Sequence, residues 1–178
     1  MKRLFLALLL VLSTMVFASE KTEILSDFNG IKPGQKAPPF GASDLLNNNK
    51  AVGLERTLKQ EKVKGVVLSI FGTYCMACVK GVQLLNDNKD QLEKKGIIVL
   101  LVSYMEASDI VEKWAREKGI KLITLNDKFG EKLKAYGMSQ KDKATLPKTF
   151  LIDKKMNILS ILESEGEDYI SVIMDSFK

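Results

Sequence analysis

The sequence predicts a three-layer α/β fold, in which helices flank a central mixed, mostly parallel sheet on both faces. From residue 65 onward, short runs of aliphatic and β-branched residues alternate with stretches of helical periodicity. The first two runs, 66–71 and 97–103, are almost entirely apolar, which is typical of strands buried on both faces. The last two, 149–152 and 158–162, lie close enough together to favour a closing antiparallel hairpin, followed by a C-terminal helix.

The other elements are placed by apolar spacing and by breaks in it. Residues 72–74 end the first strand, and a helix over about 75–95 follows, with Cys78, Val82 and Leu85 on one face. Before residue 65 the pattern is weaker, with a turn at 47–49 and a short strand over 51–54. The alternation continues with helix 107–118, strand 121–125, helix 129–136 and C-terminal helix 167–177.

The first 18 residues predict a secretory signal peptide. Lys2 and Arg3 precede an apolar run, and Val16 and Ala18 fit the positions before a cleavage site. The alternative is that residues 4–18 stay as a membrane tether, although this stretch is shorter than the ~20 residues that span a bilayer comfortably. Both alternatives place the rest of the chain outside the cytoplasm, in the periplasm or an equivalent compartment.

The remainder divides into two parts. Residues 19–33 form a leading segment that contains Gly30 and Pro33, and we expect it to be extended without a helix. Residues 34–178 form the folded domain, which is long enough to bury its own core.

Composition excludes several classes of function. The net charge of +5 is distributed in mixed sign along the chain, which does not indicate a nucleic-acid-binding surface. The absence of histidine excludes Ser-His-Asp and Cys-His catalysis and most zinc or copper(II) sites. Two cysteines are too few for an iron–sulfur site or a disulfide-stapled mini-fold.

Cys75 and Cys78 form a CxxC motif where a buried strand passes into a helix. The unpaired N–H groups and the dipole of a helix N-terminus stabilise a thiolate there, and cysteines in such sites titrate at ~3.5–7.5. Cys78 lies one turn into the helix on its apolar face, so we expect it to be buried. An exposed nucleophile with a shielded resolving cysteine is the arrangement that thiol–disulfide exchange requires.

Two other interpretations of the CxxC motif stay open. The first is a purely structural disulfide, but one that closes so short a loop removes little chain entropy and so contributes little stability. The second is a site for copper(I) or half of a zinc site, but neither a histidine nor a third cysteine completes the ligand set. No metal site or cofactor is therefore predicted.

Several motifs together resemble the TlpA/ResA group of extracytoplasmic thiol–disulfide oxidoreductases, within the thioredoxin-like superfamily. Residues 66–80, VVLSIFGTYCMACVK, resemble the strand and active-site segment of that group. Residues 34–40, GQKAPPF, are similar to its G-x-x-A-P-x-F motif, and residues 136–138, YGM, to its Y-G-V step. Residues 146–153, LPKTFLID, match its P-x-T-F-L-I-D strand. The resemblance implies a thioredoxin-like fold over 34–178.

The resemblance also assigns roles to the matching residues. It implies that Cys75 is the attacking cysteine and Cys78 the resolving one, paired as a redox-active disulfide. It implies that Pro147 is a cis-proline beside the disulfide. Leu146 would then present its backbone to the substrate chain, and Tyr74, where the family usually has tryptophan, is the second candidate substrate-binding residue.

Some positions depart from the family pattern. Ser69 stands where thioredoxins carry a buried acid, and Gly81 stands where some ResA-like proteins keep a glutamate. We therefore expect a water molecule or the helix start to handle the proton of the inner cysteine. Trp114 is expected to pack its helix against the sheet. The loop over 139–145, with Lys141 and Lys143, is either solvated or a rim that favours acidic partners.

The resemblance implies electron exchange with cysteine pairs of an extracytoplasmic protein partner, with an upstream membrane electron donor. Reduction of cysteines for cytochrome c maturation or copper-oxidase assembly is one role in the group. The competing functions are a peroxiredoxin, for which no P-x-x-x-T-x-x-C pocket or nearby arginine precedes Cys75, and a copper(I)-handling or redox-inert binding module.

Overall fold

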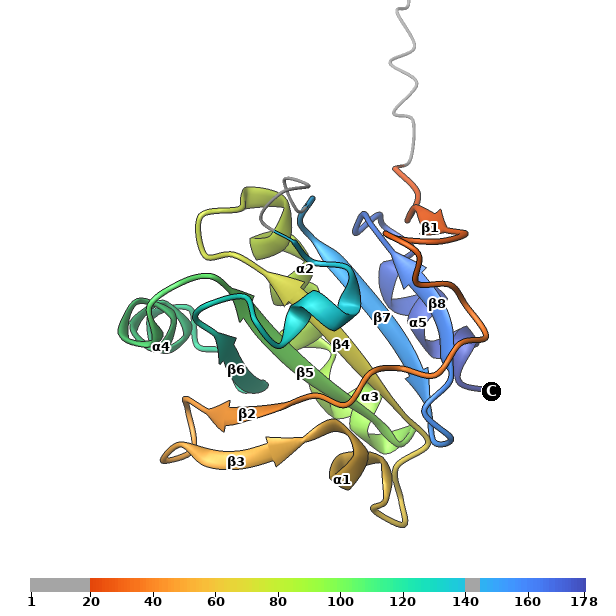
Figure 1. Ribbon diagram of the computed structural model, residues 1–178, viewed down its shortest axis with the longest axis horizontal. Helices are drawn as coiled ribbons and strands as arrows, with labels where there is room; N and C mark the ends of the chain where they lie inside the picture. Colours follow the sequence, from red (N-terminus) through yellow and green to blue (C-terminus); the bar gives the residue numbers. More distant parts are fainter. Residues whose placement is uncertain (1–19, 140–144) are drawn as a thin grey trace, which may run out of the picture.

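The computed structural model describes residues 20–139 and 145–178, arranged as a central sheet between two covering layers (Figure 1). The predicted signal or tether, and Lys141 and Lys143 of the predicted rim, lie outside the described residues. None of the helices in the described part of the chain has the length and apolar character that crossing a bilayer requires.

The main sheet has six strands in the order β1-β8-β7-β4-β5-β6. Its parallel part is formed by three strands: β4 (Gly65–Phe71), β5 (Ile97–Tyr104) and β6 (Ile123–Asp127). Its antiparallel part is formed by β7 (Lys148–Asp153), β8 (Ile158–Leu162) and β1 (Ile24–Leu25). The predicted mixed sheet and its closing antiparallel hairpin are confirmed.

Strand β4 lies at the centre, and all seven of its residues are buried. Because successive side chains of a strand point to opposite faces, Val66, Leu68 and Ile70 join one hydrophobic cluster. Val67 and Phe71 join the second cluster, on the other face. This double burial explains why the strand is apolar along its length.

Each face of the sheet has its own cover (Figure 1). One face packs against side chains of four helices: α2 (Met76–Asp87), α3 (Lys89–Lys94), α4 (Ser108–Glu117) and α5 (Tyr169–Ser176). The other face is covered by α1 (Leu54–Leu58), the 3-10 helix η1 (Leu133–Tyr136), and residues of the β2–β3 hairpin, Gly41–Asp44 and Lys50–Gly53. Trp114 stacks against Phe71 at 5.3 Å between ring centroids, which confirms that it packs α4 on the sheet.

Two predicted helices differ from the structure. The stretch over 75–95 is broken at Asn88, whose side-chain amide donates to the Leu84 carbonyl at 2.9 Å and competes with the helical pattern. The predicted helix over 129–136 is reduced to the 3-10 turn η1, which Gly137 ends at a φ of 75°. Apolar spacing does not report such local backbone bonds.

The segment before residue 65 contains more strand than the sequence predicts. Strand β2 was not predicted, and it pairs with β3 through a turn in which Asn48 and Asn49 adopt φ values of 48° and 55°. Asparagine tolerates this left-handed region better than most residues. In the leading segment, β1 pairs with β8 at the edge of the main sheet.

Candidate active site

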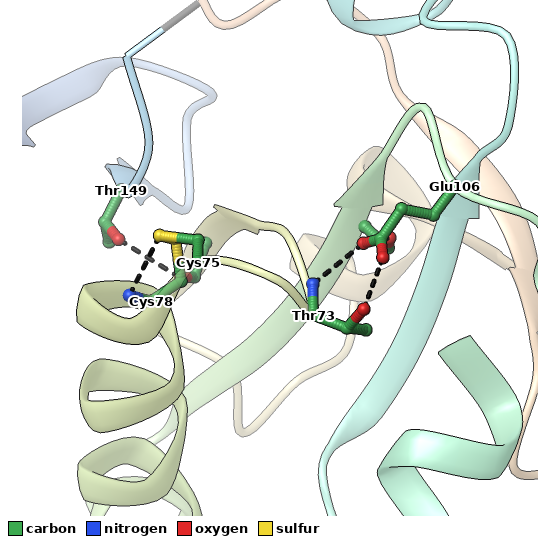
Figure 2. Close-up of a disulfide and its surroundings, with 7 residues drawn as sticks. Thr73, Cys75, Cys78, Glu106 and Thr149 are labelled. Carbon is green, nitrogen blue, oxygen red and sulfur yellow. Dashed lines mark hydrogen bonds between the residues drawn. A yellow bond between two sulfur atoms is a disulfide. The ribbon is translucent and has the colours of Figure 1, made fainter. Parts of the chain in front are cut away.

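The disulfide between Cys75 and Cys78 lies where β4 passes into α2, with 5.2 Å between the two Cα atoms (Figure 2). Cys75 is the N-cap of α2, and its Sγ accepts the backbone N–H of Cys78 at 3.2 Å. The first turn of α2 carries no acidic residue. The same N–H and the helix dipole therefore stabilise the thiolate that reduction leaves at Cys75.

The two sulfur-bearing residues differ in exposure. Cys75 is half-buried, whereas Cys78 is 1 % exposed and belongs to the hydrophobic cluster that also contains Val82 and Leu85. Tyr74 and Met76, on either side of Cys75, are the exposed residues of this loop, at 70 % and 87 %. A disulfide in the partner can approach Cys75 from solvent, but Cys78 is reached only from Cys75.

Pro147 precedes β7, and its peptide bond with Leu146 is cis. Leu146 is half-buried and packs against the clusters on both faces of the sheet. A groove of about 430 Å³ connects this bond with α2; its lining is Glu20, Ala77, Lys80, Leu146, Pro147, Glu163, Ser164 and Glu165. The structure therefore brings Leu146 and Pro147 to the same groove as the first turn of the CxxC helix.

A chain of buried hydroxyl groups runs across β4, β7 and α5. Thr149 donates to Ser69 at 3.2 Å, and its hydroxyl lies 3.0 Å from that of Tyr169. Figure 2 draws the hydrogen bond of the Thr149 hydroxyl, which is partly hidden by the disulfide in that view. Ser69 is thus one member of a neutral hydroxyl chain.

Glu106 anchors the loop that leads into the CxxC motif, a role that the sequence analysis missed. Its carboxylate accepts the Thr73 backbone N–H at 2.9 Å, the Thr73 hydroxyl, and the Ser103 hydroxyl at 2.7 Å (Figure 2). The pKa of Tyr74 is raised, mainly by burial and to a smaller extent by the negative charge of Glu106. A signal was present in the sequence: Thr73 and Glu106 follow the carboxyl ends of neighbouring parallel strands, which meet at one edge of a sheet.

Replacing Glu106 with alanine is expected to lower the free energy of unfolding by about 2 kcal/mol, because a charged acceptor of several hydrogen bonds is lost. Urea unfolding of the oxidised protein measures this loss. Glu112→Ala is the matched control. Glu112 pairs with Arg116 on the surface of α4, so this variant is expected to change the free energy of unfolding by less than about 0.5 kcal/mol. Equal losses in the two variants would show that Glu106 does not anchor the loop.

Glu165 is the second residue that the sequence analysis missed. It lies in the connection between β8 and α5 and is 8 % exposed. Its carboxyl group occupies the space beside Gly81 of α2, where a Cβ atom at Gly81 would lie 2.4 Å from it. Burial raises the pKa of Glu165 to about 8. No sequence spacing links residues so far apart, because the contact depends on how the β8–α5 connection crosses α2.

The described residues hold no group of three or more His, Cys, Asp or Glu side chains suited to a metal ion.

The fold and this disulfide together define a thioredoxin-like thiol–disulfide exchange protein. Residues 33–161 match the AhpC/TSA family. The chain is also 31 % identical over 159 residues to the thiol-disulfide oxidoreductase ResA of Geobacillus thermodenitrificans, covering 89 % of this chain and 83 % of that one. The ResA of Geobacillus kaustophilus is 30 % identical over 156 residues, or 88 % and 83 % of the two chains.

The chain therefore belongs to the AhpC/TSA family and, within it, to the thiol–disulfide oxidoreductases of ResA type. Solved structures share its fold. A putative DsbE of Chlorobium tepidum superposes with a TM-score of 0.68 at 20 % identity, over 83 % of this chain and 99 % of that one. The peroxidoxin BcpB of Mycobacterium tuberculosis gives 0.68 at 15 % identity, over 82 % and 95 %.

The likeness to a peroxidoxin concerns the fold alone. A peroxidase site needs an arginine beside its cysteine, and both arginines within the described residues are bonded elsewhere. Arg116 pairs with Glu112 on α4, and Arg56 donates to the Ala51 carbonyl beside the β2–β3 hairpin. The arrangement around Cys75 therefore fits disulfide exchange better than peroxide reduction.

Proposed function

We propose that this protein reduces disulfides of extracytoplasmic protein partners, with Cys75 as the attacking cysteine and Cys78 as the resolving one. The observation that carries the proposal is the difference in exposure within one disulfide. The half-buried Cys75 caps a helix, while the buried Cys78 lies one turn further along. A mixed disulfide can form with Cys75 and is then resolved by Cys78.

The partner chain would bind along the groove beside Pro147. Its backbone would lie against that of Leu146, and the exposed ring of Tyr74 would cover the partner side chain next to its cysteine. Support comes from the position of these residues: Leu146 and Pro147 line the groove, and Tyr74 immediately precedes Cys75. A redox couple must be renewed after each turnover, so a membrane electron donor would return electrons to the pair.

The predicted signal and the family support the proposed location and partner. Residues 1–18 would direct the chain across the membrane as a cleaved signal, or residues 4–18 would hold it there as a tether. Substrates would be cysteine pairs that must be reduced before cofactor insertion, as in cytochrome c or copper-oxidase assembly. Stoichiometric copper(I) binding by the reduced protein without disulfide turnover would instead favour the copper-handling alternative.

A trapping experiment in the producing cells tests this proposal. The Cys78→Ser variant should accumulate mixed disulfides with partner proteins, because the resolving thiol is missing. Extracytoplasmic extracts would be alkylated and separated without reductant, and the expected adducts should disappear on addition of dithiothreitol. The Cys75→Ser/Cys78→Ser variant is the control. Absence of adducts from the single variant, or equal adducts in the control, would contradict the proposal.

A further inference from the structure

Resolution of a mixed disulfide requires that Cys78 lose a proton in a buried place. The Cys78 side chain is 1 % exposed and lies among apolar residues such as Val82 and Leu85. An apolar environment disfavours a thiolate. A proton acceptor near this face of α2 would therefore accelerate the second half of the exchange reaction.

Glu165 lies on this face. Residues three apart on a helix are neighbours, with about 5–6 Å between their Cβ atoms. Gly81 is three residues after Cys78, and the Glu165 carboxyl group occupies the place that a Gly81 side chain would take. The absence of a side chain at residue 81 thus leaves room for a carboxyl group from another part of the chain, one helical turn from Cys78.

The backbone around Glu165 is fixed by the leading segment. Gly166 donates to the Thr22 hydroxyl at 3.2 Å, and Glu167 donates to the Glu20 carbonyl at 2.9 Å. A Cβ atom at Gly166 would lie 2.4 Å from the Lys21 backbone, so the two segments are in close contact. These long-range hydrogen bonds to the two residues after Glu165 fix the backbone from which its side chain extends toward α2.

The groove that contains Glu165 also contains Leu146, Pro147 and Ala77. It leads from the first turns of α2 to the proposed binding site of the partner chain. The groove borders the first turn of α2, so a water molecule in it would lie beside both the Glu165 carboxyl group and the turn that carries Cys78. We propose that Glu165 accepts the proton of the Cys78 thiol, through such a water, when Cys78 resolves the mixed disulfide.

The reaction balances as follows. The Cys75 thiolate attacks a partner disulfide, forms a Cys75–partner disulfide and releases the first partner thiolate. Cys78 gives its proton to the Glu165 carboxylate and attacks Cys75 Sγ. The Cys75–Cys78 disulfide forms, and the second partner thiolate leaves. Two electrons pass from the cysteine pair to the partner, and Glu165 later returns the proton to water.

Four titratable groups from different parts of the chain face Glu165. Lys80 of α2 lowers its pKa, but burial has the larger effect and raises it to about 8. The pKa of the Tyr169 phenol, on α5, is raised mainly by burial and to a smaller extent by the negative charge of Glu165. Glu20 and Glu163 line the same groove. The raised pKa makes the Glu165 carboxylate a stronger base than an ordinary glutamate carboxylate, which favours its acceptance of a proton.

The test follows both half-reactions of the reduced protein with the aromatic disulfide dithiobis(nitrobenzoate). Release of the first nitrothiobenzoate reports attack by Cys75, and release of the second reports resolution by Cys78. In the wild type, the rate of the second phase should rise with a midpoint near pH 8, where Glu165 ionises. In Glu165→Gln this midpoint should move to higher pH, and the second phase at pH 7 should slow at least about tenfold.

Two further variants complete the test. Gly81→Ala places a methyl group against the Glu165 carboxyl group. The methyl group should displace the carboxyl group from this place and so slow the second phase as well. Glu131→Gln removes an exposed carboxylate that pairs with Lys134 of η1, which covers the face of the sheet opposite to α2, and this variant should leave both phases unchanged. An unaltered second-phase pH profile in Glu165→Gln would overturn the proposal.

A stability measurement checks the buried state of Glu165 directly. The unfolded carboxyl group ionises near 4.5 and the folded one near 8, so the folded protein holds an extra proton between these values. The free energy of unfolding should therefore fall as the pH rises from about 4.5 to about 8, and Glu165→Gln should remove this contribution. An identical pH dependence in the variant would contradict the burial on which the inference depends.

The inference rests on the proposed function, but their failures are distinguishable. If wild-type protein shows no second phase, Cys75 and Cys78 do not exchange and the proposed function fails. If the wild type exchanges and Glu165→Gln matches it at every pH, only the role of Glu165 fails.

Discussion

Cys75→Ser is expected to lose disulfide exchange completely, because Cys75 carries the only sulfur that an incoming disulfide can reach from solvent. Cys78 is 1 % exposed and is shielded by the cluster on the inner face of α2. In single-turnover reactions with dithiobis(nitrobenzoate), the variant should react at least about a thousandfold more slowly than the reduced wild type, since both the exposure and the helix-capped thiolate are lost.

Cys78→Ser is the matched comparison. It keeps the attacking thiolate, so the first nitrothiobenzoate should be released at a rate within a few-fold of the wild type, and the second should not be released. Rapid reaction of Cys75→Ser through Cys78 would contradict the assignment of the two roles. Circular dichroism of both variants checks that the fold is kept.

Glu163→Ala is expected to cause the largest loss of stability among these substitutions. The ammonium group of Lys148 is fully buried and lies 2.6 Å from the Glu163 carboxylate, and its other described contact is the Phe28 ring at 4.3 Å. Removal of the carboxylate leaves a buried charge without its partner. Because the Glu163 side chain is 27 % exposed, we expect a loss of about 3 kcal/mol, at the lower end for a broken buried pair.

Thermal unfolding of the oxidised protein measures this loss, and a decrease in Tm of roughly 6–12 °C is expected for a chain of this size. Lys148→Met is the matched variant: it keeps the length of the side chain and leaves only a carboxylate that water can reach. Its loss should be smaller, about 1 kcal/mol. A larger loss in Lys148→Met than in Glu163→Ala would contradict this account of the pair.

The pair matters for the site because Lys148 directly follows Pro147, and Glu163 lies in the same groove. Their ion pair joins β7 to the end of β8 at the place where the partner chain is proposed to bind. A loss of this bond should therefore weaken the edge of the groove as well as the fold.

The central part of the fold was predictable because its strands are buried on both faces. Strand β4 is apolar at nearly every position, and this burial leaves a clear record in the sequence. The helix break at Asn88 and the short turn η1 were not predictable, because each depends on local hydrogen bonds that apolar spacing does not report. Strand β2 is short, and only pairing with β3 identifies it.

The candidate site divides in the same way. Cys75 and Cys78 are three positions apart in the sequence, and the CxxC motif reveals them. Glu106 and Glu165 act across long distances in the chain, on the loop before Cys75 and on the helix after it. The position of Glu106 after the end of a strand that neighbours β4 was a signal for its contact with the loop. No spacing distinguishes Glu165, so only the folded structure shows its contact with α2.

The most direct test of the account is the reduction potential of the Cys75–Cys78 pair, equilibrated against glutathione and dithiothreitol buffers. For comparison, thioredoxin lies near about −270 mV and the oxidant DsbA near about −120 mV. A single two-electron transition below about −230 mV is the expected result for a reductant of protein disulfides. A potential above about −180 mV would contradict the reducing direction, and a pair that equilibrates with neither buffer would contradict the exchange activity itself.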